Sequence, residues 1–170
     1  MACSGGSGGV GACARAAGEP WFAAYALHNL GYVAGLSGRD EAGYEQMLAA
    51  VSQWRALGDP RSTALGLNYI SPAAIRLGRL DAAQAFLEES LGLCTQVGDR
   101  WGMATAYRHQ GLLALARGDL DRAQALLRTS LDLFAGFITG WDVARTLVYL
   151  GEVLAAAGDP PGAGQAFHDA

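Results

Sequence analysis

Glycine residues recur along this chain at a fixed interval, and the interval limits the folds that the chain can adopt. Four of them mark the middle of successive units, at Gly38, Gly78, Gly118 and Gly158. The differences 78−38, 118−78 and 158−118 all equal 40. Repeats of about 20 to 50 residues are typical of solenoids, in which each unit buries its apolar face only against its neighbours.

Each unit opens with a turn signal that is followed by a helical pattern. The turn signals begin at Gly18, Gly58, Gly98 and Ile138, which divides residues 18–170 into repeats of about 18–57, 58–97, 98–137 and 138–170. The first helical pattern of the third repeat places Ala104, Tyr107, Gly111 and Ala114 on one stripe. Spacings of three and four residues indicate a helix rather than a strand.

A second helical pattern follows each central glycine, and small residues link the two patterns. In the third repeat the second stripe includes Ala123, Leu127 and Phe134. Small residues of the first pattern stand twelve positions before small residues of the second; the pairs are Gly31 and Gly43, Ser71 and Ala83, Gly111 and Ala123, and Gly151 and Ala163. Helices that cross closely need small side chains at the contact. The sequence therefore predicts an all-α fold of antiparallel helix-turn-helix units.

The composition fits one packed helical domain and excludes several functions. The chain has 170 residues, of which 51% are hydrophobic and 16% charged, with a net charge of −4. An acidic chain lacks the basic stripe that nucleic-acid binding requires. No apolar run approaches the length of a membrane helix, and the N-terminus does not resemble a secretory signal. Three cysteines without CxxC spacing fit a reducing compartment, so we expect a cytoplasmic protein.

Residues 1–17 differ from the rest because they are rich in glycine and serine. Such a segment buries too little apolar area to offset its ordering entropy, so we predict that it is mobile. Gly6 to Gly11 match the GxGxxG pattern of dinucleotide sites, which leaves an enzyme that uses these glycines as one alternative. However, the pattern needs a preceding strand and a βαβ unit, and neither is predicted. A P-loop is excluded because the chain contains no lysine.

No motif for catalysis or metal binding stands out in the remaining sequence. His28, His109 and His168 lack metal-ligand spacing, and no serine or cysteine has an evident His/Asp partner. Cys94 shares its repeat position with Trp54 and Phe134, which predicts a buried, inert thiol. Pro72 lies inside a first helix, where it is either a tolerated kink or a bend that opens the inner surface. We therefore expect no enzyme, no cofactor and no metal.

The spacing of small and large residues around each glycine break resembles the tetratricopeptide repeat. The phrases Gly98-Asp99-Arg100-Trp101-Gly102 and Arg117 to Leu127 resemble more specifically the repeats of MalT-like and LuxR-type bacterial transcriptional regulators. The resemblance covers residues 18–170 and implies a right-handed α-solenoid with a 40-residue period. It also implies that the first helices line a concave groove. Gln110 and Pro72 depart from the repeat pattern.

The groove implied by this resemblance supplies the candidate contact residues. They are aromatic, basic or amide side chains on the first helices; the candidates are Tyr25, His28, Asn29, Tyr32, Asn68, Tyr69, Arg76, Thr105, Arg108, His109, Arg145, Tyr149 and Glu152. Such groups suit a peptide or an anionic ligand. The alternative is that they form an ordinary polar surface. The Lys/Asn arrangement of carboxylate-clamp relatives is missing.

Two functional hypotheses follow from this pattern. The first is a non-catalytic arm of a bacterial regulator that binds a protein or peptide, or a small-molecule inducer, in the groove. The second is a structural or oligomerising module without a specific groove ligand. Its basis is that the outermost repeats lack the polar capping helix that repeat arrays need, so the chain is either a piece of a longer array or pairs its open end with another subunit. Self-association through these uncapped ends belongs to the second hypothesis. Neither hypothesis includes nucleic-acid or membrane binding by this segment.

Overall fold

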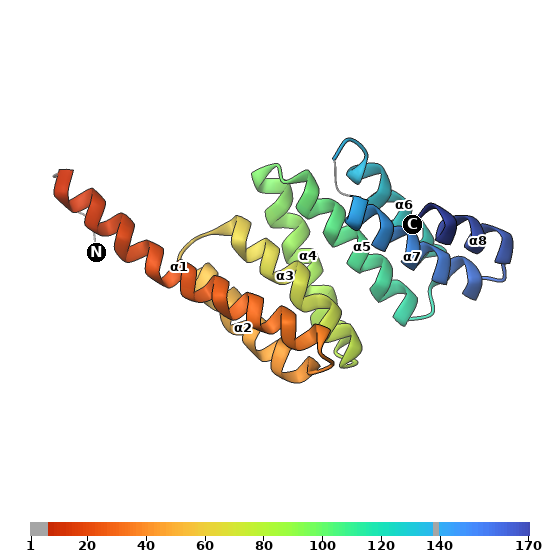
Figure 1. Cartoon of the computed structure of the whole chain (residues 1–170), viewed down its shortest axis with the longest axis horizontal. Helices are drawn as coiled ribbons and strands as arrows, with labels where there is room; N and C mark the ends of the chain where they lie inside the picture. The colour runs from red at the N-terminus through yellow and green to blue at the C-terminus, as the bar shows by residue number, and fades with distance from the viewer. Residues whose placement is uncertain (1–6, 138–139) are drawn as a thin grey trace.

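The computed structural model describes residues 7–137 and 140–170, and these residues form eight α-helices and no strand. The helices are α1 (Ser7–Leu36), α2 (Asp40–Ala56), α3 (Pro60–Arg76), α4 (Leu80–Val97), α5 (Arg100–Ala116), α6 (Leu120–Phe134), α7 (Gly140–Ala156) and α8 (Pro160–Asp169). Each helix packs against the next one in the chain, and the hairpins follow one another in series (Figure 1). The predicted all-α fold of stacked helix pairs is confirmed.

Glycines and aspartates define the turns between these helices. The glycine after each helix adopts a positive φ, as at Gly38 (75°), Gly78 (71°) and Gly118 (77°), where a side chain would be strained. At the start of α3 and α5, the carboxylates of Asp59 and Asp99 accept hydrogen bonds from backbone N–H groups of the first turn, at 3.1 and 3.0 Å. These caps satisfy donors that the helix itself leaves unpaired.

Helix α1 begins well before the position that the repeat pattern predicts. The turn signal at Gly18 places its start near that residue, yet the helix extends back to Ser7 and includes Pro20. Ala12, Ala14, Ala16 and Ala17 favour helix, and extending an existing helix costs far less than nucleating one. Residues 1–6 lie outside the described part of the chain. The mobility expected for residues 1–17 remains a prediction, although the described backbone there is helical.

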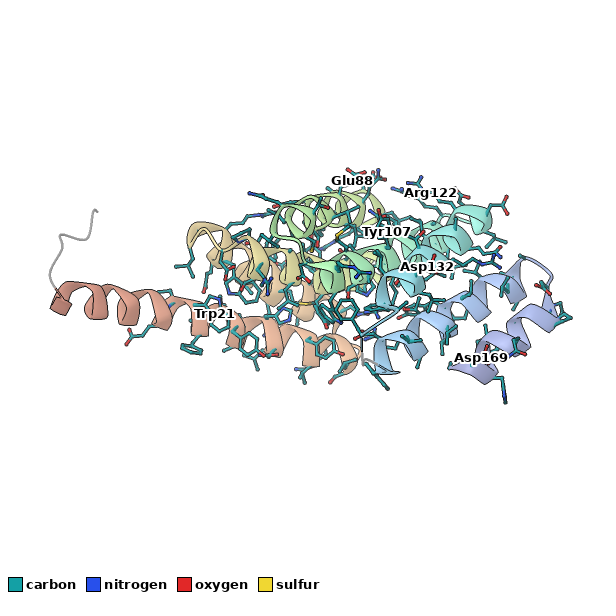
Figure 2. The ribbon with its side chains drawn as sticks, turned by 90° about the horizontal axis from the view of Figure 1, so that it is seen from above. Trp21, Glu88, Tyr107, Arg122, Asp132 and Asp169 are labelled. Carbon is teal, nitrogen blue, oxygen red and sulfur yellow. The ribbon has the colours of Figure 1, made fainter. Side chains whose placement is uncertain are left out.

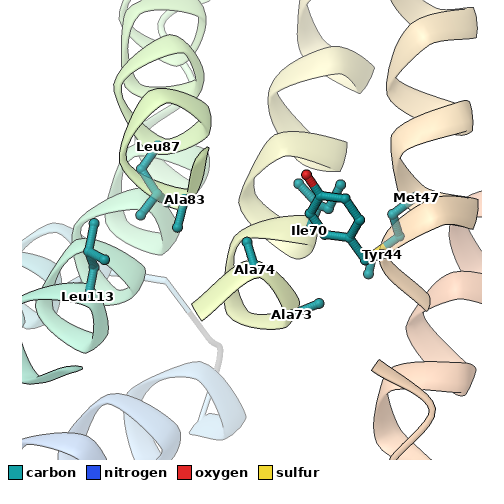
Figure 3. Close-up of a cluster of buried hydrophobic side chains, with 8 residues drawn as sticks. All are labelled: Tyr44, Met47, Ile70, Ala73, Ala74, Ala83, Leu87 and Leu113. Atoms are coloured by element: carbon teal, nitrogen blue, oxygen red, sulfur yellow. The ribbon is translucent and has the colours of Figure 1, made fainter. Parts of the chain in front are cut away.

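The core lies between successive helix pairs rather than at one centre. One cluster joins Tyr44 and Met47 of α2 to Ile70 of α3, and Leu87 of α4 and Leu113 of α5 extend it (Figure 3). A second cluster joins α5 and α6 to α7 and α8 in the same way. Trp54, Cys94 and Phe134, which share one repeat position, are at most 1% exposed. Burial raises the pKa of the Cys94 thiol, as expected for an inert cysteine.

Small residues permit the close crossing within each pair. A Cβ atom on Gly43 of α2 would lie 2.7 Å from the Gly31 carbonyl oxygen and 3.0 Å from the Gly35 nitrogen, both of α1. A Cβ atom on Gly111 would lie 2.7 Å from Leu127 Cγ. The predicted crossing at these small residues is confirmed. In the first pair, glycine at position 43 takes the place of the alanine found at the same position of later repeats.

We predict that Gly43→Ala destabilises the protein by about 1–3 kcal/mol, because backbone atoms cannot move aside as a flexible side chain can. Gly92→Ala is the matched control. Gly92 lies within α4, and its added methyl would meet nothing within 4 Å. It should stabilise the protein by about 0.4–1 kcal/mol through the unfolded chain. Urea unfolding followed by circular dichroism measures both changes, and equal effects of the two substitutions would contradict the close crossing.

Candidate binding surface

The structure divides the predicted groove residues into two sets. Five are buried, contrary to the expectation that they line an open groove; these are His28, Asn68, Thr105, Arg108 and His109. The others are exposed or half-buried; these are Tyr25, Asn29, Tyr32, Tyr69, Arg76, Arg145, Tyr149 and Glu152. Only the second set is accessible to a partner. Its role in binding remains a prediction.

The buried set is explained by contacts between successive first helices. The Asn68 side chain of α3 donates a hydrogen bond to the Gly102 carbonyl of α5 at 3.0 Å. Arg108 of α5, at the same repeat position, donates to the Asp142 carbonyl of α7 at 3.3 Å. In both cases the acceptor lies 34 residues further along the chain. This position therefore faces the next repeat rather than the groove.

Arg108 forms a buried ion pair at the junction between α5 and α7. Its guanidinium is 2.9 Å from an Asp142 carboxylate oxygen, and its side chain is 0% exposed while that of Asp142 is 13% exposed. Trp101 donates to the other carboxylate oxygen at 3.3 Å. The guanidinium also lies 5.5 Å from the centre of the Phe134 ring. The Nε and Nη2 atoms of Arg108 have no hydrogen-bond partner, so the charge depends on Asp142 for compensation.

His109 lies beside this ion pair and faces α3 at the point where Pro72 interrupts the backbone hydrogen bonds. Proline has no N–H, so the Asn68 carbonyl four residues earlier lacks its helical donor. The Asn68 carbonyl favours the protonated imidazole, although neither ring nitrogen of His109 forms a hydrogen bond with the described residues. Burial outweighs this effect, and together with Arg108 and Arg145 it holds the pKa of His109 well below its usual range. His109 is therefore a neutral side chain of the interior and not an exposed ligand.

The accessible residues bring together several aromatic rings on α1 and α3. Trp21 stacks on Tyr25 with a centroid distance of 5.3 Å and an interplanar angle of 10°. Tyr32 meets the edge of Tyr69 at 5.5 Å and 89°, and His28 meets Tyr69 at 5.3 Å. Tyr25 remains 43% exposed. Aromatic side chains held in fixed positions supply contact area at low entropic cost.

Arg145 of α7 is the one basic candidate of this surface that keeps an unpaired charge. It shares a small cavity of about 80 Å³ with Tyr32, Tyr69, Pro72 and Arg76. Burial disfavours its charged form, but Tyr149, Tyr32 and Tyr69 outweigh that effect and raise the pKa of Arg145. No ion pair of Arg145 occurs in the described part of the chain, whereas Arg76 pairs with Asp40 at 2.6 Å. The arrangement suits an incoming anionic group.

The described residues do not support a metal site, a membrane-spanning helix or a dinucleotide-binding glycine turn. Within 7–137 and 140–170, no three His, Cys, Asp or Glu side chains lie close enough together to hold a metal ion. None of the described helices has both the length and the apolar character needed to cross a membrane. Of the GxGxxG segment, Gly6 falls outside the described residues, and Ser7 to Gly11 form helix rather than a glycine turn.

Comparison with known proteins supports the repeat assignment. A tetratricopeptide-repeat family model matches residues 67–136, which include most of α3 and all of α4, α5 and α6. No curated protein sequence matches the chain.

Solved structures extend the likeness over most of the chain. BtubC (BKLC) from P. vanneervenii superposes with a TM-score of 0.70 at 22% identity, covering 88% of this chain and 62% of that chain. Two structures from Podosopora anserina, described as kinesin light chain with nearly identical TPR-like repeats, give TM-scores of 0.62 and 0.59 at 14% identity. They cover 85% and 86% of this chain, and 71% and 72% of theirs. The fold is therefore that of a TPR-like solenoid, and the chain spans less than two thirds of the length of BtubC.

We predict that Asp142→Ala destabilises the protein more than Arg108→Met does. Removing the carboxylate leaves a buried guanidinium unpaired, which typically costs about 3–5 kcal/mol. Removing the guanidinium leaves Asp142 still in contact with solvent and with Trp101, so the cost should be less than half as large. Guanidinium unfolding of the two variants provides the measurement. Equal losses would show that Arg108 does not depend on this carboxylate.

The low pKa of His109 predicts a loss of stability in acid. The unfolded chain takes up a proton on this side chain as the pH falls through about 6.5, while the folded chain does not until a much lower pH. His109 thus favours unfolding progressively below that value, and the effect is absent above it. The His109→Gln variant should lose less stability than wild type between about pH 7 and pH 5.

Thermal melting at several pH values tests this effect. His168→Gln is the matched control, because His168 is exposed on α8. A His109→Gln profile parallel to that of wild type would contradict the buried neutral imidazole.

Proposed function

We propose that this chain is a non-catalytic protein-interaction module that binds a segment of a partner protein along its first helices. TPR-like repeats generally mediate protein–protein interactions, and the fold is typical of scaffolds rather than enzymes. Solenoids of this kind present extended concave surfaces for binding. The candidate contact residues on that surface are the accessible set around Tyr25, Tyr32, Tyr69 and Arg145.

The observation that carries the proposal is the unpaired charge of Arg145 beside the half-buried Tyr32 and Tyr69. A partner segment with an acidic side chain would pair with the guanidinium, and the Tyr32 and Tyr69 hydroxyls beside it could donate to the same group. Aromatic or aliphatic side chains next to the acidic one would lie on Tyr25 and Tyr32. Arginine and tyrosine are common among the few residues that contribute most of the binding free energy at protein interfaces.

The wider setting of the module is also a proposal. The resemblance of its sequence phrases to MalT-like and LuxR-type proteins supports an arm of a bacterial transcriptional regulator that works in the cytoplasm. In that setting a small-molecule inducer would occupy the same groove as the peptide. The proposal assumes a right-handed solenoid with a 40-residue period, as the sequence predicts. It assigns no direct nucleic-acid binding to this segment and includes no membrane contact.

A second candidate is a structural or oligomerising module that has no specific groove ligand. The observation in its favour is the exposure of large apolar side chains on the outermost helix pairs, such as Leu30 (58%) and Trp141 (72%). Exposed apolar patches on soluble proteins often mark interaction surfaces. In this case the accessible tyrosines and Arg145 would be an ordinary polar surface. The two candidates differ in which surface a partner needs, so substitutions separate them.

We predict that the Arg145→Met variant loses at least about tenfold in affinity for peptides selected on the wild-type protein. A displayed random-peptide library supplies these peptides, and acidic sequences with a neighbouring aromatic residue should be enriched. Loss of a charged hydrogen bond costs about 1.5–3 kcal/mol, which corresponds to that change in affinity.

Arg128→Met is the matched control, because Arg128 is exposed on α6 and does not line the cavity around Arg145. Fluorescence anisotropy gives both affinities. Selection of no peptide, or equal binding by the two variants, would remove the groove from the proposal.

A further inference from the structure

One face of α1 exposes apolar side chains at positions that later repeats bury. Phe22, Leu30 and Val33 are 67%, 58% and 53% exposed. The residues at the position of Val33 in later repeats are Ala73, Leu113 and Val153, and these are at most 5% exposed. In those repeats the preceding helix pair covers the position. We call the exposed set Phe22, Leu30 and Val33 the leading face.

The opposite end of the solenoid shows the converse pattern on α7 and α8. Trp141, Val148 and Phe167 are 72%, 38% and 47% exposed. The residues at the position of Phe167 in earlier repeats are Met47, Leu87 and Leu127, and these are at most 2% exposed. We call the set Trp141, Val148 and Phe167 the trailing face. Figure 2 labels Trp21 on α1 and Asp169 on α8, the helices that carry parts of the two faces.

The internal junctions show which positions meet when one repeat stacks on the next. The Asn68 side chain contacts Gly102 at 3.0 Å, and Arg108 contacts Asp142 at 2.9 Å. Val148 occupies the repeat position of Asn68 and Arg108. In the first repeat, the position of Gly102 and Asp142 belongs to Phe22. The same stacking between two molecules would therefore set Val148 against Phe22, an apolar pair in place of a polar one.

Two more contacts between successive repeats would have equivalents between two stacked molecules. Trp21 donates a hydrogen bond to the Asp59 carboxylate at 2.9 Å. Trp141 occupies the position of Trp21, and Glu19 occupies that of Asp59, so the stacked molecules would join an indole N–H to a carboxylate again.

The third contact is apolar. Met47 packs with Ile70 in the buried cluster between the first two repeats. Phe167 and Leu30 are their equivalents on the trailing and leading faces. Each of the three pairs expected between stacked molecules is compatible: two pairs are apolar, and the third joins an indole N–H to a carboxylate.

We propose that a second copy of this chain docks its leading face on the trailing face of the first, continuing the solenoid from one molecule into the next. The proposal deepens, and rests on, the oligomerising candidate described above. An unrelated partner would have to present a carboxylate opposite Trp141 and an aromatic ring opposite Val148, which the chain's own leading face already does. Because the two faces differ, the contact is heterologous and builds a ring or an open filament.

Polar residues at the internal junctions also oppose incorrect stacking. If the leading face displaced the last pair and met α5, Phe22 would cover Arg108 and leave that buried charge without Asp142. A buried unpaired charge is strongly unfavourable. The trailing face carries no such group, because Val148 replaces the polar residues found at this position in the other three repeats. The leading face of one molecule should therefore stack on the trailing face of another and not on α5.

Analytical ultracentrifugation of the full chain over a wide concentration range tests the proposal. Wild type should form species larger than a dimer, or a closed ring, as concentration rises. Leu30→Glu and Val148→Glu should each remain monomeric when studied alone. Mixed in equal amounts they should form a dimer and nothing larger, since each variant contributes one intact face. Leu57→Glu is the matched control, because Leu57 is exposed but belongs to neither face, and it should assemble as wild type does.

The outcomes separate this proposal from the one on which it rests. A monomeric wild type at every concentration would overturn both the head-to-tail contact and the oligomerising candidate. Assembly that survives Val148→Glu but not Leu30→Glu would indicate a symmetric contact between leading faces, which overturns head-to-tail docking and keeps oligomerisation. Circular dichroism of each variant confirms that a monomeric variant is still folded. None of these outcomes tests the separate proposal that the groove binds a peptide.

A cysteine cross-link tests the register in a background in which Cys3 and Cys13 are replaced by serine. Phe22→Cys and Val148→Cys, prepared as separate variants and mixed under mild oxidation, should give a covalent dimer on a non-reducing gel. Leu57→Cys mixed with Val148→Cys is the control and should not, because a disulfide requires the two Cα atoms to approach within about 7 Å. Equal cross-linking in both mixtures, or none in the first while assembly persists, would overturn the assigned register.

Discussion

Stacking of helix pairs is the interaction on which the rest of this structure depends. No single pair can bury its apolar surface, because a residue such as Ile70 of α3 is covered by Tyr44 and Met47 of the preceding pair. The close crossing within each pair makes stacking possible, since Gly31 and Gly43 bring α1 and α2 together with no room for a methyl group. The energy of folding is therefore distributed over junctions between neighbours. The apolar side chains Leu30, Val33 and Phe167 are exposed at repeat positions that a neighbouring pair covers elsewhere in the described structure.

The junctions between successive first helices differ in their buried polar contacts. Asn68 binds a backbone carbonyl and is held by Ser90 at 2.9 Å. At the same position of the next repeat, Arg108 requires the carboxylate of Asp142. A junction that needs a carboxylate cannot be satisfied by a pair that offers a glycine, because the guanidinium would remain buried and unpaired. Buried ion pairs add little net stability compared with apolar residues, but removing one partner is costly, so Arg108 restricts which residue can face it at this junction.

The sequence predicted the helix pairs, their glycine turns and most of the core, because these features follow from local spacing. Gly118 needs a positive φ, and Leu127 falls on an apolar stripe whatever lies beyond. The sequence pattern failed for Arg108 and His109, since a polar side chain on a helix is expected at the surface. These two side chains are buried by packing against neighbouring helices. The contact over 34 residues, from Asn68 to Gly102 and from Arg108 to Asp142, became visible only in the structure, because no local spacing links these residues. The helical start of α1 was missed because the glycines and serines of this segment outweighed its alanines in the prediction.

The proposed groove and the two end faces use different side chains of the same helices. Arg145 shares a cavity with Tyr32 and Tyr69, whereas Phe22 and Val148 occupy the repeat positions through which successive first helices contact each other. Head-to-tail assembly would therefore leave each groove open and place copies of it at regular intervals along one continuous surface. A partner with several acidic segments would then bind many weak sites at once, and linked weak contacts raise overall affinity steeply when their spacing matches that of the sites. In that arrangement a modest single groove, with one unpaired arginine, is sufficient for strong binding.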